Sequence, residues 1–117
     1  MRVLVENGSH HLDQIELSVI QDIQQLLAEQ SGLIWLDLNG DGLDLCRQVM
    51  EDEFHFHPLA VDDALVETHI PKIDDWGDYV YLALEGVHSE QLLDDLDKSL
   101  ELDVFMGKQY IVTYHPE

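Results

Sequence analysis

Residues 79–84 constrain the fold more than any other part of the chain, because all six side chains are apolar or aromatic. Successive side chains of a β-strand point to opposite faces of its sheet, so this strand would present apolar groups on both faces. Strands of this kind are typical of sheets that are covered on both sides. The acidic stretch 74–78 forms the turn expected before it. We therefore predict a central strand at residues 79–84.

Other segments carry strand or helix patterns bounded by Gly, Pro, Asn or Asp. The remaining predicted strands are residues 2–6, 33–38, 100–106 and 110–114, the last two joined as a hairpin through Gly107-Lys108. The predicted helices are one capped by Ser18 with Gln21 and stopped by Gly32, one at residues 43–53, and a short one from Pro58 that stops before Pro71. Residues 89–98 fit either a short helix or a loop.

The order of these elements bounds the fold class. A chain of 117 residues is the size of one domain with one modest core. Strand, helix, strand, two helices and then several strands favour an α/β or α+β domain with a mixed β-sheet over an all-α or all-β fold. We predict a single domain over residues 1–117. The chain stops at Glu117, soon after a strong strand pattern, which suggests a domain taken from a longer protein.

The charge balance limits the kinds of partner that this chain can bind. The chain has 25 Asp and Glu against 5 Lys and Arg, for a formal net charge of -20. Such a surface repels nucleic acid and anionic membranes and attracts cations. It also repels itself in the compact state, so we expect stability to depend on ionic strength and on divalent ions. An acidic surface that only maintains solubility is the alternative interpretation.

Targeting and cysteine signals are weak in this sequence. The longest apolar run, residues 79–84, is far below the roughly 20 residues of a membrane-spanning helix. The N-terminal residues lack the long apolar core of a signal peptide, so a soluble cytoplasmic chain is the default expectation. Cys46 has no second cysteine to pair with, and its apolar neighbours on a predicted helix indicate a buried, inert thiol.

Two motifs suggest metal sites that are incomplete. Asp37-x-Asn39-x-Asp41-Gly42 matches the first half of a calcium-binding EF-hand loop, but the twelfth position is Gln48 where calcium requires a bidentate Glu. We interpret this segment as a turn and helix cap. His55 and His57 lie two residues apart, as in some zinc sites, yet two ligands do not make a site. For them we predict that His57 caps the following helix and that His55 faces solvent.

Asp62 and Asp63 are adjacent on the helix predicted from Pro58. Their side chains should diverge by about 100°, so they cannot readily bind one ion together. A solvated acidic helix face is one interpretation. The other is a magnesium site, because magnesium prefers oxygen ligands and often contacts only one or two carboxylates while keeping much of its water.

Catalytic motifs are missing. The sequence has no Gly-x-Ser-x-Gly, no glycine-rich phosphate loop, and no cysteine with a nearby histidine partner. We therefore expect that this chain is not an enzyme.

A longer stretch, residues 54–86, carries a specific order of motifs. These are His57-Pro58-Leu59, Asp62-Asp63-Ala64-Leu65, Pro71-Lys72 and Gly77-Asp78-Tyr79, flanked by residues 35–38 upstream and by residues 102–107 and 111–113 downstream. In this order they resemble the CorA family of magnesium and cobalt transporters. The resemblance covers most of the chain from Leu33 onward, and the N-terminal third matches loosely.

This resemblance implies the N-terminal cytoplasmic domain of a homopentameric transporter at the inner face of the cell membrane. The family fold is an α/β/α sandwich in which helices lie on both faces of a mixed sheet. In the family a long stalk helix and two membrane helices follow this domain, together with a Gly-Met-Asn pore motif. None of these parts is in residues 1–117, so we expect the domain itself to be soluble and not to conduct ions.

The resemblance also assigns a role to Asp62 and Asp63. In the family an acidic pair at this position provides ligands for Mg²⁺ between neighbouring cytoplasmic domains, and bound magnesium favours the closed pore. Partner carboxylates are expected from a region beyond Glu117. Two positions differ from the family pattern, because many relatives have Glu at the place of Asp62 and a basic residue at the place of Ile70.

Two alternatives remain open. One is a zinc-transporting member of the same family, suggested by the seven histidines, with Co²⁺ also a possible ion. The other is a soluble acidic module that buffers calcium or binds a partner without any membrane.

Overall fold

Seven strands form a single mixed sheet with the order β2-β1-β3-β7-β6-β5-β4. The computed structural model describes residues 1–6, 12–15, 21–29, 32–66, 70–87 and 99–116. All neighbouring strands are antiparallel except β3 and β7, which are parallel. The strands are β1 Arg2–Glu6, β2 Leu12–Ile15, β3 Ile34–Asn39, β4 Lys72–Asp75, β5 Val80–Val87, β6 Ser99–Met106 and β7 Tyr110–His115. The predicted α/β class with a mixed sheet is confirmed.

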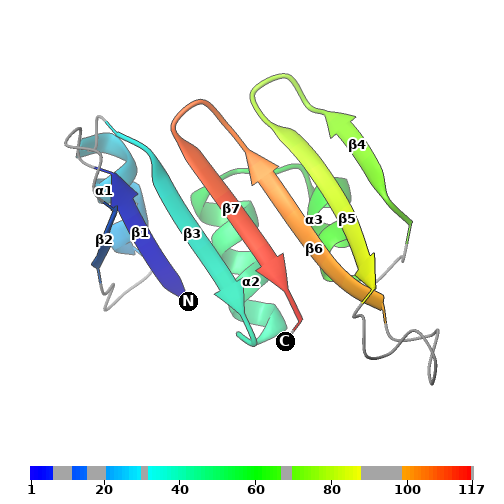
Figure 1. Ribbon diagram of the computed structural model, residues 1–117. Helices are drawn as coiled ribbons and strands as arrows, with labels where there is room; N and C mark the ends of the chain where they lie inside the picture. The colour runs from blue at the N-terminus through cyan, green and yellow to red at the C-terminus, as the bar shows by residue number, and fades with distance from the viewer. Residues whose placement is uncertain (7–11, 16–20, 30–31, 67–69, 88–98, 117) are drawn as a thin grey trace.

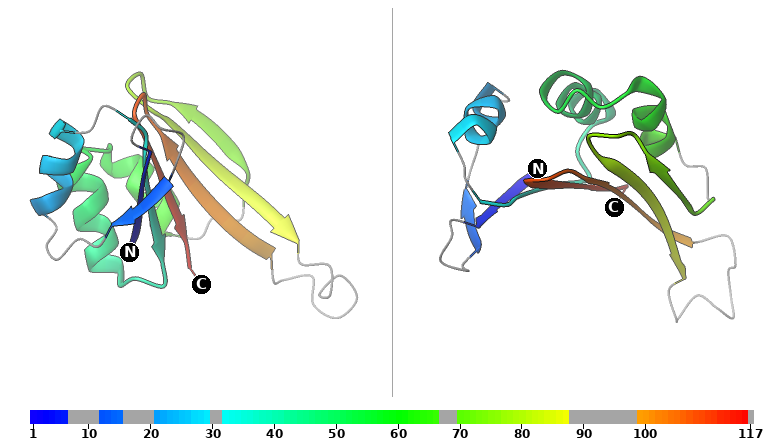
Figure 2. Two further views of the ribbon diagram at one scale, coloured as in Figure 1. Left: turned by 60° about the vertical axis from the view of Figure 1, so that its left-hand side comes forward. Right: turned by 90° about the horizontal axis from the view of Figure 1, so that it is seen from above.

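The helices lie together on one face of this sheet (Figures 1 and 2). They are α1 Gln21–Glu29, α2 Leu43–Gln48 and α3 Pro58–Leu65, and a π-helical segment, Val49–Glu53, continues α2. In the views of Figure 2 the second face carries no helix within the described ranges, so the helices on both faces that the family resemblance implied are not present there. None of the described helices is both long enough and apolar enough to span a membrane.

The core lies between the helices and the covered sheet face. Phe56 follows the π-helical segment and stacks on Phe105 of β6, with ring centroids 4.2 Å apart. Both rings are buried, so they join the helical layer to the sheet at its centre. Other buried residues on this side are Val3, Val5, Leu36, Leu38, Cys46, Val49, Met50, Ala60, Val61, Tyr81 and Val112. The predicted burial of the Cys46 thiol is confirmed.

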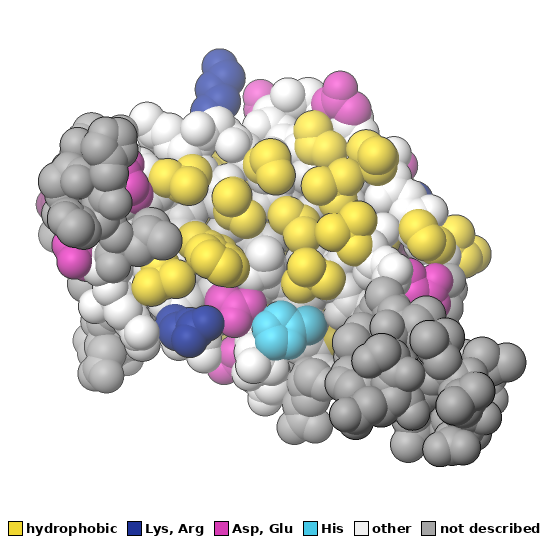
Figure 3. Space-filling view, viewed as in Figure 1, with side chains coloured by type: hydrophobic (Ala, Val, Ile, Leu, Met, Phe, Trp, Pro, Cys, Tyr) yellow, Lys and Arg dark blue, Asp and Glu magenta, His cyan; other side chains and the backbone are white. Residues whose placement is uncertain are grey.

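The second face of the sheet is also largely apolar. Figure 3 shows hydrophobic side chains gathered across its middle. The strand registers place Trp35, Leu82, Val104 and Ile111 on this face, because their neighbours in each strand point toward the helices. Leu84 on the same face remains 47% exposed. The apolar pattern of residues 79–84 therefore reflects two apolar faces, of which the described helices cover one.

Several predicted elements differ in detail. Strand β5 is an interior strand, but it lies next to the edge strand β4, and the middle of the sheet is occupied by β7. Asp74 and Asp75 end β4 instead of forming a turn, because this short segment pairs with β5. The helix at residues 43–53 changes to π-helix at Val49. The proposed Ser18 cap and residues 89–98 lie outside the described residues.

Candidate functional site

Helix α3 presents the acidic pair. Pro58 occupies the first turn, where its missing N–H removes no helical hydrogen bond. His57 is the N-cap, and its Nδ1 accepts a hydrogen bond from the backbone N–H of Leu59 at 3.1 Å. This confirms the capping role predicted for His57. Asp62 and Asp63 lie between buried positions of the helix, which are Ala60, Val61, Ala64 and Leu65.

Asp62 faces α2. Its Oδ1 is 2.9 Å from Nη1 of Arg47, and the same nitrogen lies 3.2 Å from Oε1 of Glu51. The hydrogen bond from Arg47 to Asp62, followed by the nearby carboxylate charges, raises the pKa of the guanidinium. Both side chains of the Arg47–Asp62 pair are about half exposed, at 42% and 53%. The Asp62 side of α3 is therefore a solvent-facing cluster of one cation and two carboxylates.

Asp63 faces the edge of the sheet. Its Oδ2 contacts Nζ of Lys72 on β4, and the same nitrogen lies 3.0 Å from Oδ2 of Asp74. The hydrogen bonds from Lys72 to Asp63 and then to Asp74 raise the pKa of the ammonium group. All three side chains are about one-third exposed. A single ammonium group thus joins a helix carboxylate to a strand carboxylate.

A buried hydrogen bond lies beneath this second cluster. Lys72 Nζ is 5.8 Å from the ring centroid of Tyr81 on β5. The Tyr81 hydroxyl donates a 2.5 Å hydrogen bond to Oδ1 of Asp103, and both residues are fully buried. Burial, the hydrogen bond to Asp103 and the negative charges of Asp103, Asp63 and Glu101 raise the pKa of Tyr81. The Asp63 side of α3 is therefore less exposed to solvent than the Asp62 side, and more carboxylates lie near it.

The geometry of α3 bears on whether the pair fits a divalent cation. Asp62 and Asp63 diverge and contact different cations, so the prediction that they do not clasp one ion together agrees with the structure. Their oxygens are hard donors of the kind that Mg²⁺ uses, and Mg²⁺ keeps several waters beside one or two carboxylates. Asp63 and Asp74 converge on one positive centre, the Lys72 ammonium. The donor chemistry therefore fits a small cation, and each aspartate would serve a separate site.

The other predicted metal motifs do not converge. Asp41 accepts hydrogen bonds from the N-terminal amine and from Asn39 N–H, which confirms a turn. The same segment provides the helix cap, because Gly42 is the N-cap of α2, although no side chain makes a capping hydrogen bond there. His55 is exposed, as predicted. In the part of the chain that the structure describes, no group of three or more His, Cys, Asp or Glu side chains is arranged to hold a metal.

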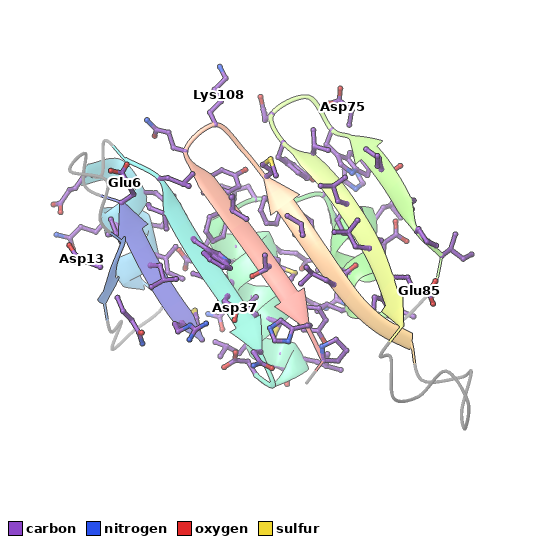
Figure 4. The ribbon with its side chains drawn as sticks, in the orientation of Figure 1. Glu6, Asp13, Asp37, Asp75, Glu85 and Lys108 are labelled. Carbon is purple, nitrogen blue, oxygen red and sulfur yellow. The ribbon has the colours of Figure 1, made fainter. Side chains whose placement is uncertain are left out.

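A chain of hydrogen-bonded side chains lies at one end of the second face of the sheet, and it was not predicted from the sequence. Trp35 Nε1 donates to Thr113 Oγ1 at 2.9 Å, and Thr113 Oγ1 donates to Asp37 Oδ1 at 2.7 Å. His115 Nε2 lies 3.2 Å from the same Asp37 oxygen. Figure 4 shows Asp37 near the carboxyl ends of β3 and β7. The signal available in the sequence was the alternation of Trp35 with Asp37 and of Thr113 with His115.

Comparisons with known proteins give the family and the fold. Residues 30–117 match the family described as CorA-like Mg2+ transporter protein. The Bacillus subtilis protein YfjQ, named as a metal ion transporter, is 32% identical over 81 residues, which are 69% of this chain and 24% of YfjQ. The chain thus spans about a quarter of that relative's length.

Solved structures resemble the whole chain. The full-length CmaX protein has a TM-score of 0.75 at 18% identity and covers 100% of this chain, which matches 35% of CmaX. The cytoplasmic domain of ZntB from Vibrio parahaemolyticus has a TM-score of 0.70 at 14% identity, covering 98% of this chain and 43% of that domain. At these identities the likeness establishes the fold and nothing further.

Proposed function

The chain belongs to the CorA-like Mg2+ transporter protein family, and from this premise we propose that it is the metal-sensing cytoplasmic domain of a divalent cation transporter. The observation that carries the proposal is the outward position of Asp62 and Asp63 on α3, with partly exposed carboxylates on two sides of the helix. The net charge of -20 supports it, because such a chain attracts cations from solution. The proposed role is transport regulation and not catalysis.

The proposed ligands are Asp62 and Asp63, and the proposed ion is Mg²⁺ or Co²⁺. Each aspartate would provide one carboxylate of a site completed by a neighbouring subunit, because each faces away from the other. In the ion-free assembly, acidic domains repel one another. An ion held between two domains offsets this repulsion and stabilises the assembled state, so the ion concentration sets the population of that state.

We propose a homopentamer at the cytoplasmic face of the membrane, with the membrane-spanning part outside residues 1–117. Reading the gene beyond the codon for Glu117 tests this arrangement at the lowest cost. Two long apolar segments with a Gly-Met-Asn motif would support it. A stop codon directly after Glu117 would instead favour the soluble acidic module.

Limited proteolysis of the whole protein tests the role of the pair. Mg²⁺ should protect the wild type from cleavage, and the double substitution Asp62→Ala with Asp63→Ala should weaken this protection. The matched control is Asp44→Ala with Asp52→Ala, which removes two exposed aspartates from α2 and the π-helical segment. Unchanged protection in the Asp62 and Asp63 variant would exclude the pair as the sensor.

A zinc transporter is the second candidate, because the ZntB cytoplasmic domain shares the fold. His55, exposed beside α3, is a nitrogen donor that suits zinc better than magnesium. The candidates can be separated by measuring the uptake of Mg²⁺, Co²⁺ and Zn²⁺ into cells that express the whole protein, with radioactive isotopes or fluorescent indicators of each ion. Selective Zn²⁺ uptake would replace the magnesium assignment while leaving the domain's family unchanged.

A further inference from the structure

Lys72 occupies the place beside Asp63 that an external cation would need. Its Nζ contacts Asp63 of α3 and lies 3.0 Å from Asp74 of β4. The chain has only 5 Lys and Arg residues, and both Lys72 and Arg47 are engaged with the two aspartates of α3. In a chain of net charge -20, the contact of one short helix with two cationic side chains from neighbouring elements is a specific arrangement.

The position of the ammonium group is set by the fold. Lys72 begins β4, and its pairing with Ala83 of β5 directs the side chain toward the helical layer. The Tyr81 ring lies beneath the ammonium at 5.8 Å, where ring and cation attract each other. Lysine carries a compact charge with three donors, so one ammonium can contact both carboxylates at once. The ammonium is thus held by three elements, α3, β4 and β5.

From this geometry we propose that Lys72 is an internal counter-ion that competes with divalent cations for Asp63 and so sets the cation concentration to which the domain responds. This inference rests on the proposed metal role of Asp63. A divalent ion that binds the Asp63 carboxylate must displace the ammonium or share the oxygen with a like charge. Both outcomes cost free energy, so Lys72 weakens cation binding at this aspartate and raises the concentration required.

Arg47 differs from Lys72 in this respect. Its guanidinium contacts Asp62 from a more exposed position and also contacts Glu51 in the π-helical segment that continues α2. Water and salt screen this pair more strongly. Asp62 is therefore the aspartate more open to an incoming cation, and Asp63 is the one whose response depends on its lysine.

The test measures the Mg²⁺ concentration that gives half-maximal protection of the whole protein from proteolysis. Lys72→Met removes the charge and keeps the apolar stem, and we expect the midpoint to fall about three- to tenfold. Lys72→Arg keeps a positive charge and should not lower the midpoint. Lys108→Met is the matched control, because it removes the same charge from the turn between β6 and β7 and leaves the contacts of Lys72 with Asp63 and Asp74 in place.

Equal midpoints for Lys72→Met and Lys108→Met would overturn the proposal. Lys72→Gln is a second neutral variant in case the methionine variant folds poorly, and an unchanged midpoint in both neutral variants also overturns it. The metal role of Asp63 and the counter-ion role of Lys72 can be contradicted independently of each other. If the Asp62 and Asp63 double variant loses protection while the Lys72 variants match wild type, the metal role stands and the counter-ion role fails. If the double variant keeps protection, the metal role fails.

Discussion

Asp62 and Asp63 are neighbours in the sequence, yet their carboxylates lie in different surroundings. Asp62 is 53% exposed and contacts the guanidinium of Arg47. Asp63 is 32% exposed and contacts the ammonium of Lys72, above the buried pair of Tyr81 and Asp103. Each residue of an α-helix is rotated by about 100° from the one before it, so a two-residue acidic motif becomes two chemically distinct sites. The comparison shows that such a motif should be assigned residue by residue.

The largest effect on the free energy of unfolding is expected from the buried hydrogen bond beneath Asp63. Tyr81→Phe removes the hydroxyl that donates to the buried carboxyl of Asp103, and should lower the free energy of unfolding by about 1–3 kcal/mol. Tyr79→Phe is the matched control, because the buried Tyr79 hydroxyl accepts a hydrogen bond from the neutral backbone N–H of His57, and its loss should cost about 0.5–1.5 kcal/mol. Urea unfolding at neutral pH measures both. A smaller loss of stability for Tyr81→Phe than for Tyr79→Phe would contradict a stabilising role for the hydrogen bond between Tyr81 and Asp103.

The two aspartates should also differ in stability. Asp63→Asn breaks a partly buried contact and should cost about 0.5–1 kcal/mol more than Asp62→Asn, whose exposed pair contributes little. Both substitutions relieve one negative charge in a chain of net charge -20, so this general gain cancels in the comparison. Asp52→Asn, at an exposed position, measures the general gain alone. Equal unfolding free energies for Asp62→Asn and Asp63→Asn would contradict a difference in stability between the two aspartate contacts.

High pH should remove the difference between the two aspartates. The pKa of Lys72 is raised in the fold from its ordinary value of 10.5 by Asp63 and Asp74. A raised pKa in the folded state means that the stabilisation is complete below the unfolded value and is lost as pH rises through the folded value. Arg47 stays charged throughout this range.

NMR titration of the lysine side chains measures the Lys72 pKa directly. It should lie above 10.5 in the wild type and fall in Asp63→Asn. The stability cost of Asp63→Asn should shrink above the Lys72 pKa, whereas that of Asp62→Asn should not change. A Lys72 pKa that does not respond to Asp63→Asn would show that the contact is absent in solution.

Much of the fold was predictable from local patterns. The strand at residues 2–6, the 100–114 hairpin and the helix begun by Pro58 and capped by His57 were found, because alternation and capping act over a few residues. Strands β2 and β4 have four residues each, too few to show a period. The Asp74 segment was therefore interpreted as a turn.

The partners of the acidic pair were not predictable in the same way. Glu51 follows Arg47 by one helical turn, which indicates an ion pair, but the sequence does not show that Asp62 from another helix joins it. In the sequence, Lys72 stands out only as part of the Pro71-Lys72 motif. Its contact with Asp63 depends on how β4 lies beside α3, and such long-range packing leaves no local signal.

Salt should produce the smallest effect. At 1 M NaCl the screening length falls to about 3 Å, so the exposed Arg47–Asp62 pair should lose its contribution of a few tenths of a kcal/mol. The Lys72–Asp63 contact is less exposed and should retain part of its contribution. Unfolding of Arg47→Met and Lys72→Met at low and high salt measures this. A larger salt response for the lysine variant would reverse the order of the two sites.

The most direct measurement is an anomalous-difference map from crystals of the whole protein grown with Mn²⁺ in place of Mg²⁺. We predict a metal peak within direct coordination distance of a carboxylate oxygen of Asp62 or Asp63. Where the metal contacts Asp63, Nζ of Lys72 should have left that carboxylate. Metal peaks found only elsewhere, with Lys72 still joining Asp63 to Asp74 at saturating Mn²⁺, would contradict the assignment of α3 as the cation-sensing element.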